Sequence, residues 1–180
     1  SAFPPPMEYS ESPLGVGRSN VGNASSTVLP EGAKLGPNQI IVFDDYDKGL
    51  AYAKMVNKPI MLDFTGHACV NCRKMENNVW SDASVLPILK NEVVVISLYV
   101  DDKRLLPKSE QFTSKSTGAE IETIGDKWTD FMIFKYNTNT QPLYVLTDLQ
   151  GNNLNNKQPT ISYVSIEEYY AWLKEGISKF

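Results

Sequence analysis

The feature that most constrains this chain is a short apolar run followed by a loop and two cysteines. Residues 58–77 read KPIMLDFTGHACVNCRKMEN. The run 60–64 is typical of a strand buried on both faces, and helical spacing begins at Cys69. Cysteines three positions apart at a helix start can close a disulfide, and the first thiol lies where the helix dipole and free N–H groups favour a thiolate. The pattern predicts a dithiol redox site at Cys69 and Cys72.

Composition limits what else the chain can be. Its 180 residues fit one domain with an extension or two small domains, and 42% hydrophobic residues are enough for a core. The net charge of −4 gives no reason to expect nucleic acid or an anionic membrane surface as a partner. We find no apolar run approaching the ~20 residues that span a bilayer, and we expect no signal peptide in this sequence.

The cysteine count excludes a scaffold stapled by several disulfides, because both cysteines of the chain lie in the one pair. A structural zinc site usually has four protein ligands. Cys69, Cys72 and the single histidine, His67, supply three, so zinc would require a carboxylate or a water as well. A metal site therefore remains an alternative to redox chemistry, although we expect none.

Residues 1–38 differ in composition from the rest of the chain. They are rich in Pro, Gly, Ser and Asn, lack periodicity and include three successive prolines, so we expect a linker or tether. Residues 101–123 are polar and charged, which predicts a partly ordered, exposed insertion loop. This insertion could serve partner recognition or be a solvated loop.

Residues 39–180 alternate between strand and helix patterns, which predicts one α/β domain. The β-α-β-α-β order up to the run 93–100 implies a parallel sheet with helices packed on it. Ser165, with Glu168 three residues later, matches a capping box. The expected strands are 39–43, 60–64, 93–100 and 141–146, with a hairpin to 161–163, and the expected helices begin at 44 or 45, 69, 83, 124 and 165.

These residues resemble the thioredoxin-like superfamily. Asp63 lies six residues before Cys69, as in the thioredoxin signature, and Pro142, after Gln141, stands where the family has a cis-proline opening a later strand. The resemblance covers about four fifths of the chain and implies a thioredoxin-like fold, with a central mixed sheet flanked by helices and an N-terminal extended tether. Departures are the residues 66–68 before Cys69, which lack the family's tryptophan, and the long insertion.

A closer resemblance is to the C-terminal periplasmic domains of DsbD-type thiol:disulfide interchange proteins. It rests on the segments CVNCRKME at 69–76 and VWSD at 79–82, and on the strand 93–100 followed by two aspartates. It implies a soluble periplasmic domain of an inner-membrane protein, acting in electron transfer and cytochrome c biogenesis. The implied partners are protein disulfide substrates and a membrane-embedded dithiol, with no cofactor besides the redox-active disulfide. We expect a monomer.

The resemblance also assigns roles, each with an ordinary structural alternative. Cys69 is the expected nucleophile and Cys72 the resolving thiol. Asp63 is expected to shuttle the proton of Cys72, or else to make a structural hydrogen bond. Glu76 is expected to add negative charge near the dithiol, or to be a solvated helix carboxylate.

The remaining candidates concern the binding of a partner. Pro142 is expected to place the backbone of Gln141 beside the disulfide, where an extended partner segment could add hydrogen bonds, unless it is an ordinary strand-start proline. His67 could stabilise the thiolate or be an exposed loop histidine. Val70 and Asn71, between the cysteines, complete the expected binding residues.

The function that these features predict is a thiol–disulfide oxidoreductase acting as a protein-disulfide reductase. The alternatives are a soluble thioredoxin-like oxidase or isomerase, and a copper-binding module that uses both cysteines and His67. A redox-inert binding domain is a third possibility. The sequence does not determine the direction of electron flow, because small electrostatic contributions set the reduction potential.

Overall fold

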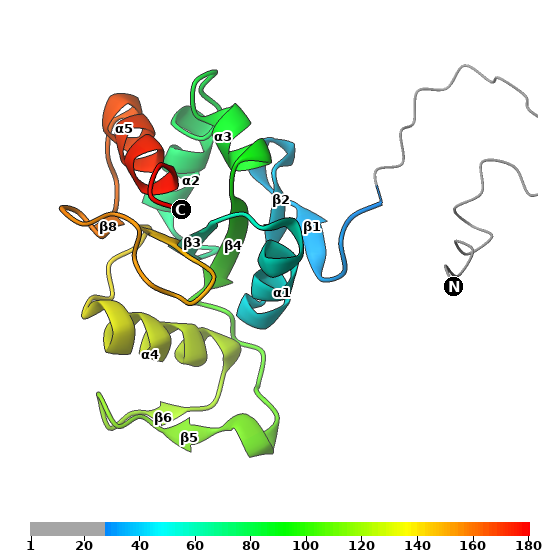
Figure 1. Cartoon of the computed structure of the whole chain (residues 1–180). Coiled ribbons are helices and arrows are strands. Elements are labelled where there is room, and N and C mark those ends of the chain that lie inside the picture. Colours follow the sequence, from blue (N-terminus) through cyan, green and yellow to red (C-terminus); the bar gives the residue numbers. More distant parts are fainter. Residues whose placement is uncertain (1–27) are drawn as a thin grey trace, which may run out of the picture.

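A computed structural model describes residues 28–180, which form helices around a central sheet (Figure 1). The sheet has six strands in the order β1-β2-β4-β3-β7-β8. The strands β2, β4 and β3 run parallel, whereas β1, β7 and β8 are antiparallel to their neighbours. The predicted mixed sheet is therefore confirmed. Its strands are β1 (Ala33–Leu35), β2 (Ile41–Phe43), β3 (Ile60–Thr65), β4 (Val94–Tyr99), β7 (Leu143–Thr147) and β8 (Thr160–Ile161).

Helices pack on both faces of the sheet, and alternate residues of β3 enter two separate cores. Leu62 and Phe64 belong to the core beneath α1 and α4, whereas Met61 belongs to the core beneath α2, α3 and α5. This alternation follows from the two-residue period of a strand. The helices are α1 (Tyr46–Val56), α2 (Val70–Asn78), α3 (Leu86–Asn91), α4 (Ile124–Tyr136) and α5 (Ile166–Ile177), with short 3-10 turns η2 (Pro37–Gln39) and η3 (Lys108–Glu110).

The helix starts follow local sequence signals. Asp45 caps α1 by accepting a hydrogen bond from the Lys48 N–H, and Ser165 caps α5 by accepting one from the Glu168 N–H. At Ser165 the structure shows only this first bond of the expected capping box. A complete capping box stands instead at the start of α4, between Thr123 and Asp126.

The sheet begins earlier than the sequence predicts. Residues 1–27 of the expected tether lie outside the described residues. Within residues 28–38, however, β1 pairs antiparallel with β2 along the edge of the sheet, so this part of the segment belongs to the domain. A three-residue strand in a Pro/Gly-rich stretch carries almost no periodicity, and its pairing partner rather than its own sequence defines it.

The insertion at 101–123 has regular structure of its own. It contains a two-stranded hairpin of β5 (Phe112–Thr113) and β6 (Glu120–Ile121), which lies beside α4 (Figure 1). The Ser114 hydroxyl donates a hydrogen bond to the Asp130 carboxylate of α4. Gly125 permits the close approach of α4 to the end of β4, because a Cβ there would lie 2.5 Å from the Val100 carbonyl oxygen.

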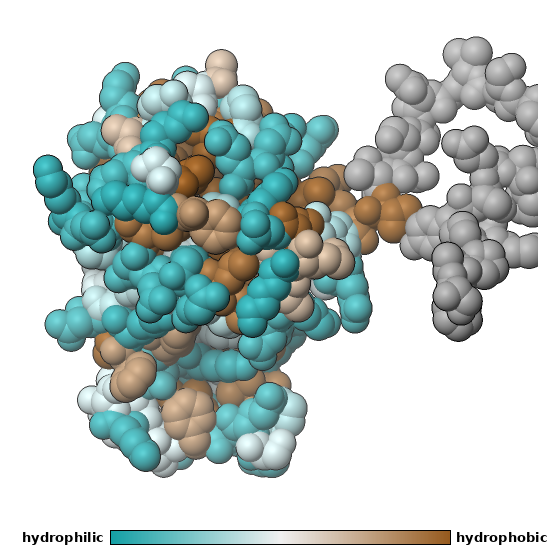
Figure 2. Space-filling model, viewed as in Figure 1, coloured by the Kyte–Doolittle hydropathy of each residue, from teal (hydrophilic) through white to brown (hydrophobic). Residues whose placement is uncertain are grey.

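The face of the described residues seen in Figure 2 is mostly hydrophilic. In Figure 2 the hydrophobic side chains on the visible face form only small groups among polar ones. Among residues 28–180, no helix combines the length and apolar composition that crossing a membrane requires.

We predict that Tyr169→Phe destabilises the domain by about 1–3 kcal/mol, because the fully buried Trp80 Nε1–H now donates to the Tyr169 hydroxyl at 3.1 Å and would lose that acceptor. Guanidinium unfolding of the oxidised chain measures the change. The matched control is Tyr170→Phe on the exposed side of the same helix, expected within about 0.5 kcal/mol of wild type. Equal effects of both substitutions would contradict the prediction.

Candidate active site

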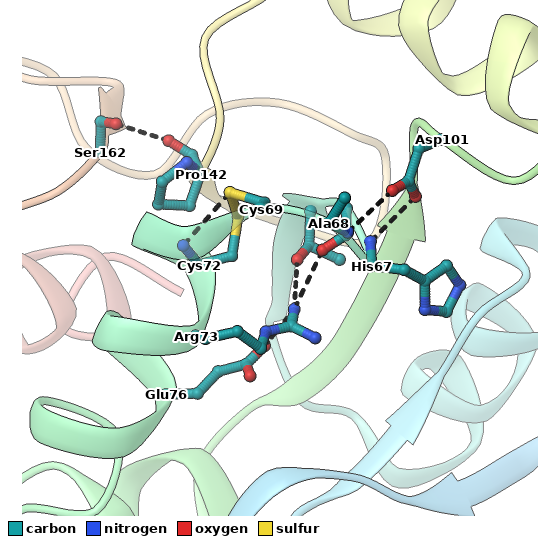
Figure 3. Close-up of a disulfide and its surroundings, with 11 residues drawn as sticks. His67, Ala68, Cys69, Cys72, Arg73, Glu76, Asp101, Pro142 and Ser162 are labelled. Atoms are coloured by element: carbon teal, nitrogen blue, oxygen red, sulfur yellow. Dashed lines mark hydrogen bonds and ion pairs between the residues drawn. A yellow bond between two sulfur atoms is a disulfide. The ribbon is translucent and has the colours of Figure 1, made fainter.

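The two cysteines form a disulfide where β3 gives way to α2 (Figure 3). Cys69 is the N-cap of α2, and its sulfur accepts a hydrogen bond from the Cys72 N–H at 3.2 Å. Cys72 is 1% exposed, whereas Cys69 is partly exposed. The sulfur of Cys69 is therefore the one that a partner can reach first, and it lies at the positive end of the helix dipole.

An aspartate that the sequence reasoning missed holds the loop before the disulfide. The carboxylate of Asp101, just beyond β4, accepts hydrogen bonds from the N–H groups of His67 at 2.9 Å and Ala68 at 3.0 Å (Figure 3). Desolvation alone would raise the pKa of Asp101, but these two backbone donors and the nearby His67 outweigh it and lower that pKa. The sequence feature that could have pointed to Asp101 is its position just after the strand that pairs with β3.

The loop requires a glycine at its first position. A Cβ on Gly66 would lie 2.8 Å from Oε1 of Gln141 and 3.2 Å from Oδ2 of Asp101. The loop thus passes tightly between the end of β4 and the residue before Pro142. This crowding fixes where the chain leaves β3 and hence where α2 begins.

His67 is exposed, and its ring stacks on Tyr99 with the two ring centroids 4.1 Å apart. Lys34 Nζ lies 5.1 Å from the centroid of the same tyrosine ring. Figure 3 shows the His67 imidazole turned away from the sulfur atoms. One of the two interpretations of His67 needs its side chain beside the thiol, and the structure does not place it there.

Asp63 is a carboxyl group buried in the core face that α2 covers. It is 2% exposed, and its Oδ2 accepts a hydrogen bond from the Ser97 hydroxyl at 2.9 Å. Desolvation raises its pKa to about 7, with the Ser97 hydrogen bond and the Arg73 charge opposing this rise and the Glu76 charge adding to it. A carboxyl group with this pKa exchanges a proton near neutral pH.

Glu76 is buried rather than solvated, with 7% exposure. It lies one turn after Cys72, and its Oε1 accepts a hydrogen bond from Arg73 Nη2 at 3.0 Å. Desolvation raises the pKa of Glu76, and the Arg73 charge lowers it in part. Glu76 is therefore not the solvated helix carboxylate of the alternative interpretation, and its effect on the dithiol stays a prediction.

Pro142 follows a cis peptide bond from Gln141, as predicted. The pairing of Phe64 with Leu143 places Pro142 beside the end of β3 and therefore beside the disulfide (Figure 3). The Ser162 hydroxyl donates a hydrogen bond to the Pro142 carbonyl oxygen at 2.5 Å. Gln141 itself is exposed, so its backbone lies at the surface next to the site.

Two other expected binding residues lie on the surface between the cysteines. Val70 is 66% exposed and Asn71 is also exposed. With the partly exposed Cys69 they form the accessible edge of the site.

Within residues 28–180 no three His, Cys, Asp or Glu side chains lie together as a metal site would require.

Comparison with known proteins shows what this chain resembles. Residues 41–120 match the family model described as Thioredoxin-like. A region of 101 residues, 54% of this chain, is 28% identical to the thiol:disulfide interchange protein DsbD of Ralstonia nicotianae, of which it spans 17%. The chain thus corresponds to a small part of that relative.

One solved structure with a TM-score above 0.5 supports the fold. A DsbH oxidoreductase has a TM-score of 0.52 at 17% identity, over 74% of this chain and 82% of that one. The reduced C-terminal domain of DsbD from Neisseria meningitidis has a TM-score of 0.48 at 14% identity, over 71% of this chain and 90% of that one.

The chain therefore has a thioredoxin-like fold, residues 41–120 match the Thioredoxin-like family model, and a disulfide of the Cys-x-x-Cys type lies at the N-terminus of α2. Proteins similar to this chain include DsbD and DsbH.

We predict that Asp63 makes stability fall as pH rises. Its folded pKa of about 7 lies above its ordinary value of 3.8, so its protonated form stabilises the fold fully below pH 4, and this contribution is lost as pH rises to about 7. At 1.36 kcal/mol per pKa unit the loss is about 4 kcal/mol. Unfolding of oxidised wild type and Asp63→Asn at pH 4, 5.5, 7 and 8 measures it as the difference between the two chains.

The asparagine variant is the control, since it retains every other titrating group. Its stability relative to wild type should rise between pH 4 and 7 and then stay level. A difference that does not change with pH would mean that Asp63 ionises at its ordinary pKa despite its burial.

Proposed function

We propose that this chain is a protein-disulfide reductase, which passes electrons from a membrane-embedded dithiol to periplasmic partner proteins through Cys69 and Cys72. The observation that carries the proposal is the graded access to the pair. Cys69 is partly exposed at the N-cap of α2, Cys72 is 1% exposed behind it, and the buried carboxyl group of Asp63 lies under the same helix.

The first step uses the exposed thiolate. The Cys69 thiolate attacks one sulfur of the partner's disulfide, so a Cys69–partner S–S bond forms while the partner's own S–S bond breaks and its second sulfur leaves as a thiolate. The Cys72 N–H, which now donates to the Cys69 sulfur, and the N-terminal end of α2 stabilise the negative charge on Cys69 before the attack.

The second step releases the partner. Cys72 gives its proton to the Asp63 carboxylate and attacks the Cys69 sulfur, which forms the Cys69–Cys72 bond and breaks the mixed disulfide. The partner's first sulfur leaves as a thiolate, so the partner has gained two electrons. Its two thiolates take protons from solvent, and Asp63 keeps the proton of Cys72. A carboxyl group with a pKa of about 7 serves this transfer because both of its forms are populated near neutral pH.

The partner's chain has a place to bind beside the sulfur atoms. The exposed backbone of Gln141, before Pro142, offers main-chain groups to an extended segment, and the exposed Val70 offers apolar contact on the other side of Cys69. We propose that Gln141, Val70 and Asn71 contact the partner and that recognition depends mostly on main-chain shape.

The similarity to DsbD supports the cellular setting. That relative is named a thiol:disulfide interchange protein, and the match covers 17% of it, so this chain would supply one domain of such an assembly. A periplasmic location, a membrane-embedded electron donor and a contribution to cytochrome c biogenesis follow from the same proposal.

The reduction potential of the Cys69–Cys72 pair tests the direction of electron flow. We expect a value near about −270 mV, the thioredoxin range, in equilibrium with a dithiothreitol series followed by mass spectrometry of alkylated thiols. A value near about −120 mV, that of the strong periplasmic oxidants, would reverse the assigned direction and favour the oxidase alternative. A reduced pair that binds Cu(I) tightly and never forms a disulfide would instead indicate the copper module.

The assignment of nucleophile and resolving thiol has its own test. Reduced Cys72→Ala treated with glutathione disulfide should keep one glutathione on Cys69, because no second thiol can release it. The wild type should return to its intramolecular disulfide, and the matched Cys69→Ala variant should react at least about tenfold more slowly because its remaining thiol is buried. Equal adducts on both variants would contradict the assigned order.

A further inference from the structure

One side chain, Arg73, connects the three segments that surround the disulfide. The two N–H groups of its Nη2 are shared among three acceptors, namely Thr65 Oγ1 at 3.1 Å, the Gly66 carbonyl oxygen at 3.3 Å and Glu76 Oε1 at 3.0 Å. Thr65 ends β3, Gly66 opens the loop and Glu76 belongs to α2. Figure 3 shows the guanidinium beside Glu76 beneath the disulfide. The arginine therefore fixes how α2 lies relative to the strand that carries Asp63.

The charges that face Asp63 come from the same arginine and its partner. The Arg73 cation lowers the pKa of Asp63 and the Glu76 carboxylate raises it. The other groups that face Asp63 are neutral, because Ser97 donates a hydroxyl and burial keeps the phenol pKa values above 10. These phenols come from β4, β7 and α5, and they are Tyr99, Tyr144 and Tyr169.

The pairing of Arg73 with Glu76 is thus a local charge balance. The side chain of Arg73 is 39% exposed and that of Glu76 is 9% exposed, so solvent screens the cation more than the anion. Removing either partner leaves one charge uncompensated beside Asp63. Removing both leaves only burial and the Ser97 hydrogen bond to set the pKa of Asp63.

We propose that Arg73 is a positioning residue that sets the pH range of disulfide exchange, by holding the strand, loop and helix around the disulfide and by balancing Glu76 beside Asp63. The proposal rests on the proposed function, because it concerns the proton that Asp63 exchanges with Cys72. The Glu76 charge raises the pKa of Asp63, and the Arg73 charge opposes this rise.

The test compares four chains, namely wild type, Arg73→Met, Glu76→Gln and the double variant. The readout is the pH dependence of the rate at which the reduced chain reduces glutathione disulfide. We expect Arg73→Met to move the profile to higher pH by about one unit and Glu76→Gln to move it to lower pH. The double variant should lie between the two single variants. Arg73→Lys, which keeps the charge, should return the profile most of the way to wild type.

The matched control removes an equal charge from the exposed neighbour on α2. Lys74→Met should leave the profile within about 0.2 unit of wild type, because exposed charges are screened. Arg73→Met and Lys74→Met with the same profile would overturn the proposal. If Arg73→Met does not fold, Glu76→Gln decides, and an unmoved profile for that variant also overturns it.

A second readout separates this inference from the proposed function. Carboxyl carbon chemical shifts report the Asp63 pKa in the oxidised chain without any exchange reaction. Arg73→Met should raise that pKa and Glu76→Gln should lower it. A wild type that exchanges no disulfide, together with these shifts, would refute the reductase and keep the charge balance. A wild type that exchanges disulfides, together with an Asp63 pKa that neither substitution changes, would keep the reductase and refute the charge balance.

Discussion

The site depends on the pairing of β3 with a strand on each side. β3 is buried over its whole length and pairs parallel with β4 and antiparallel with β7. Because β4 runs alongside β3 in the same direction, its far end delivers Asp101 to the loop that leaves β3. Because β7 runs in the opposite direction, its beginning delivers Pro142 to the same end. Three distant segments of the chain thus meet at the disulfide because of strand register alone.

Local patterns were enough to predict the parts of this arrangement that lie close together in the sequence. The apolar run of β3, the helix that starts at Cys69 and the proline before β7 each carry a recognisable pattern, and the structure has all three. The buried position of Asp63 also followed from its place inside an apolar strand. In each case a short range of residues contains both the signal and the element it predicts.

The parts that could not be predicted depend on contacts across long sequence separations. Asp101 falls in a segment that reads as a polar insertion, and only the β3–β4 register reveals that its carboxylate caps the loop at His67 and Ala68. β1 is three residues long and exists through its pairing with β2. The sequence left two interpretations of His67 open, and only the structure shows that its ring stacks on Tyr99.

Burial of Asp63 links stability to chemistry. A carboxyl group in an apolar core destabilises the fold when it is ionised, so the protein is more stable with the proton present. The proposed reaction, in contrast, needs the ionised form of Asp63 to accept a proton from Cys72. A pKa of about 7 is a compromise between these demands, and the burial of Asp63 under α2 prevents solvent from reducing the effect. The Arg73–Glu76 pair lies close enough to Asp63 for a change in either charge to shift the pKa of Asp63. Under the proposed mechanism, the same fold can therefore be adjusted towards faster or slower proton transfer without changing either cysteine.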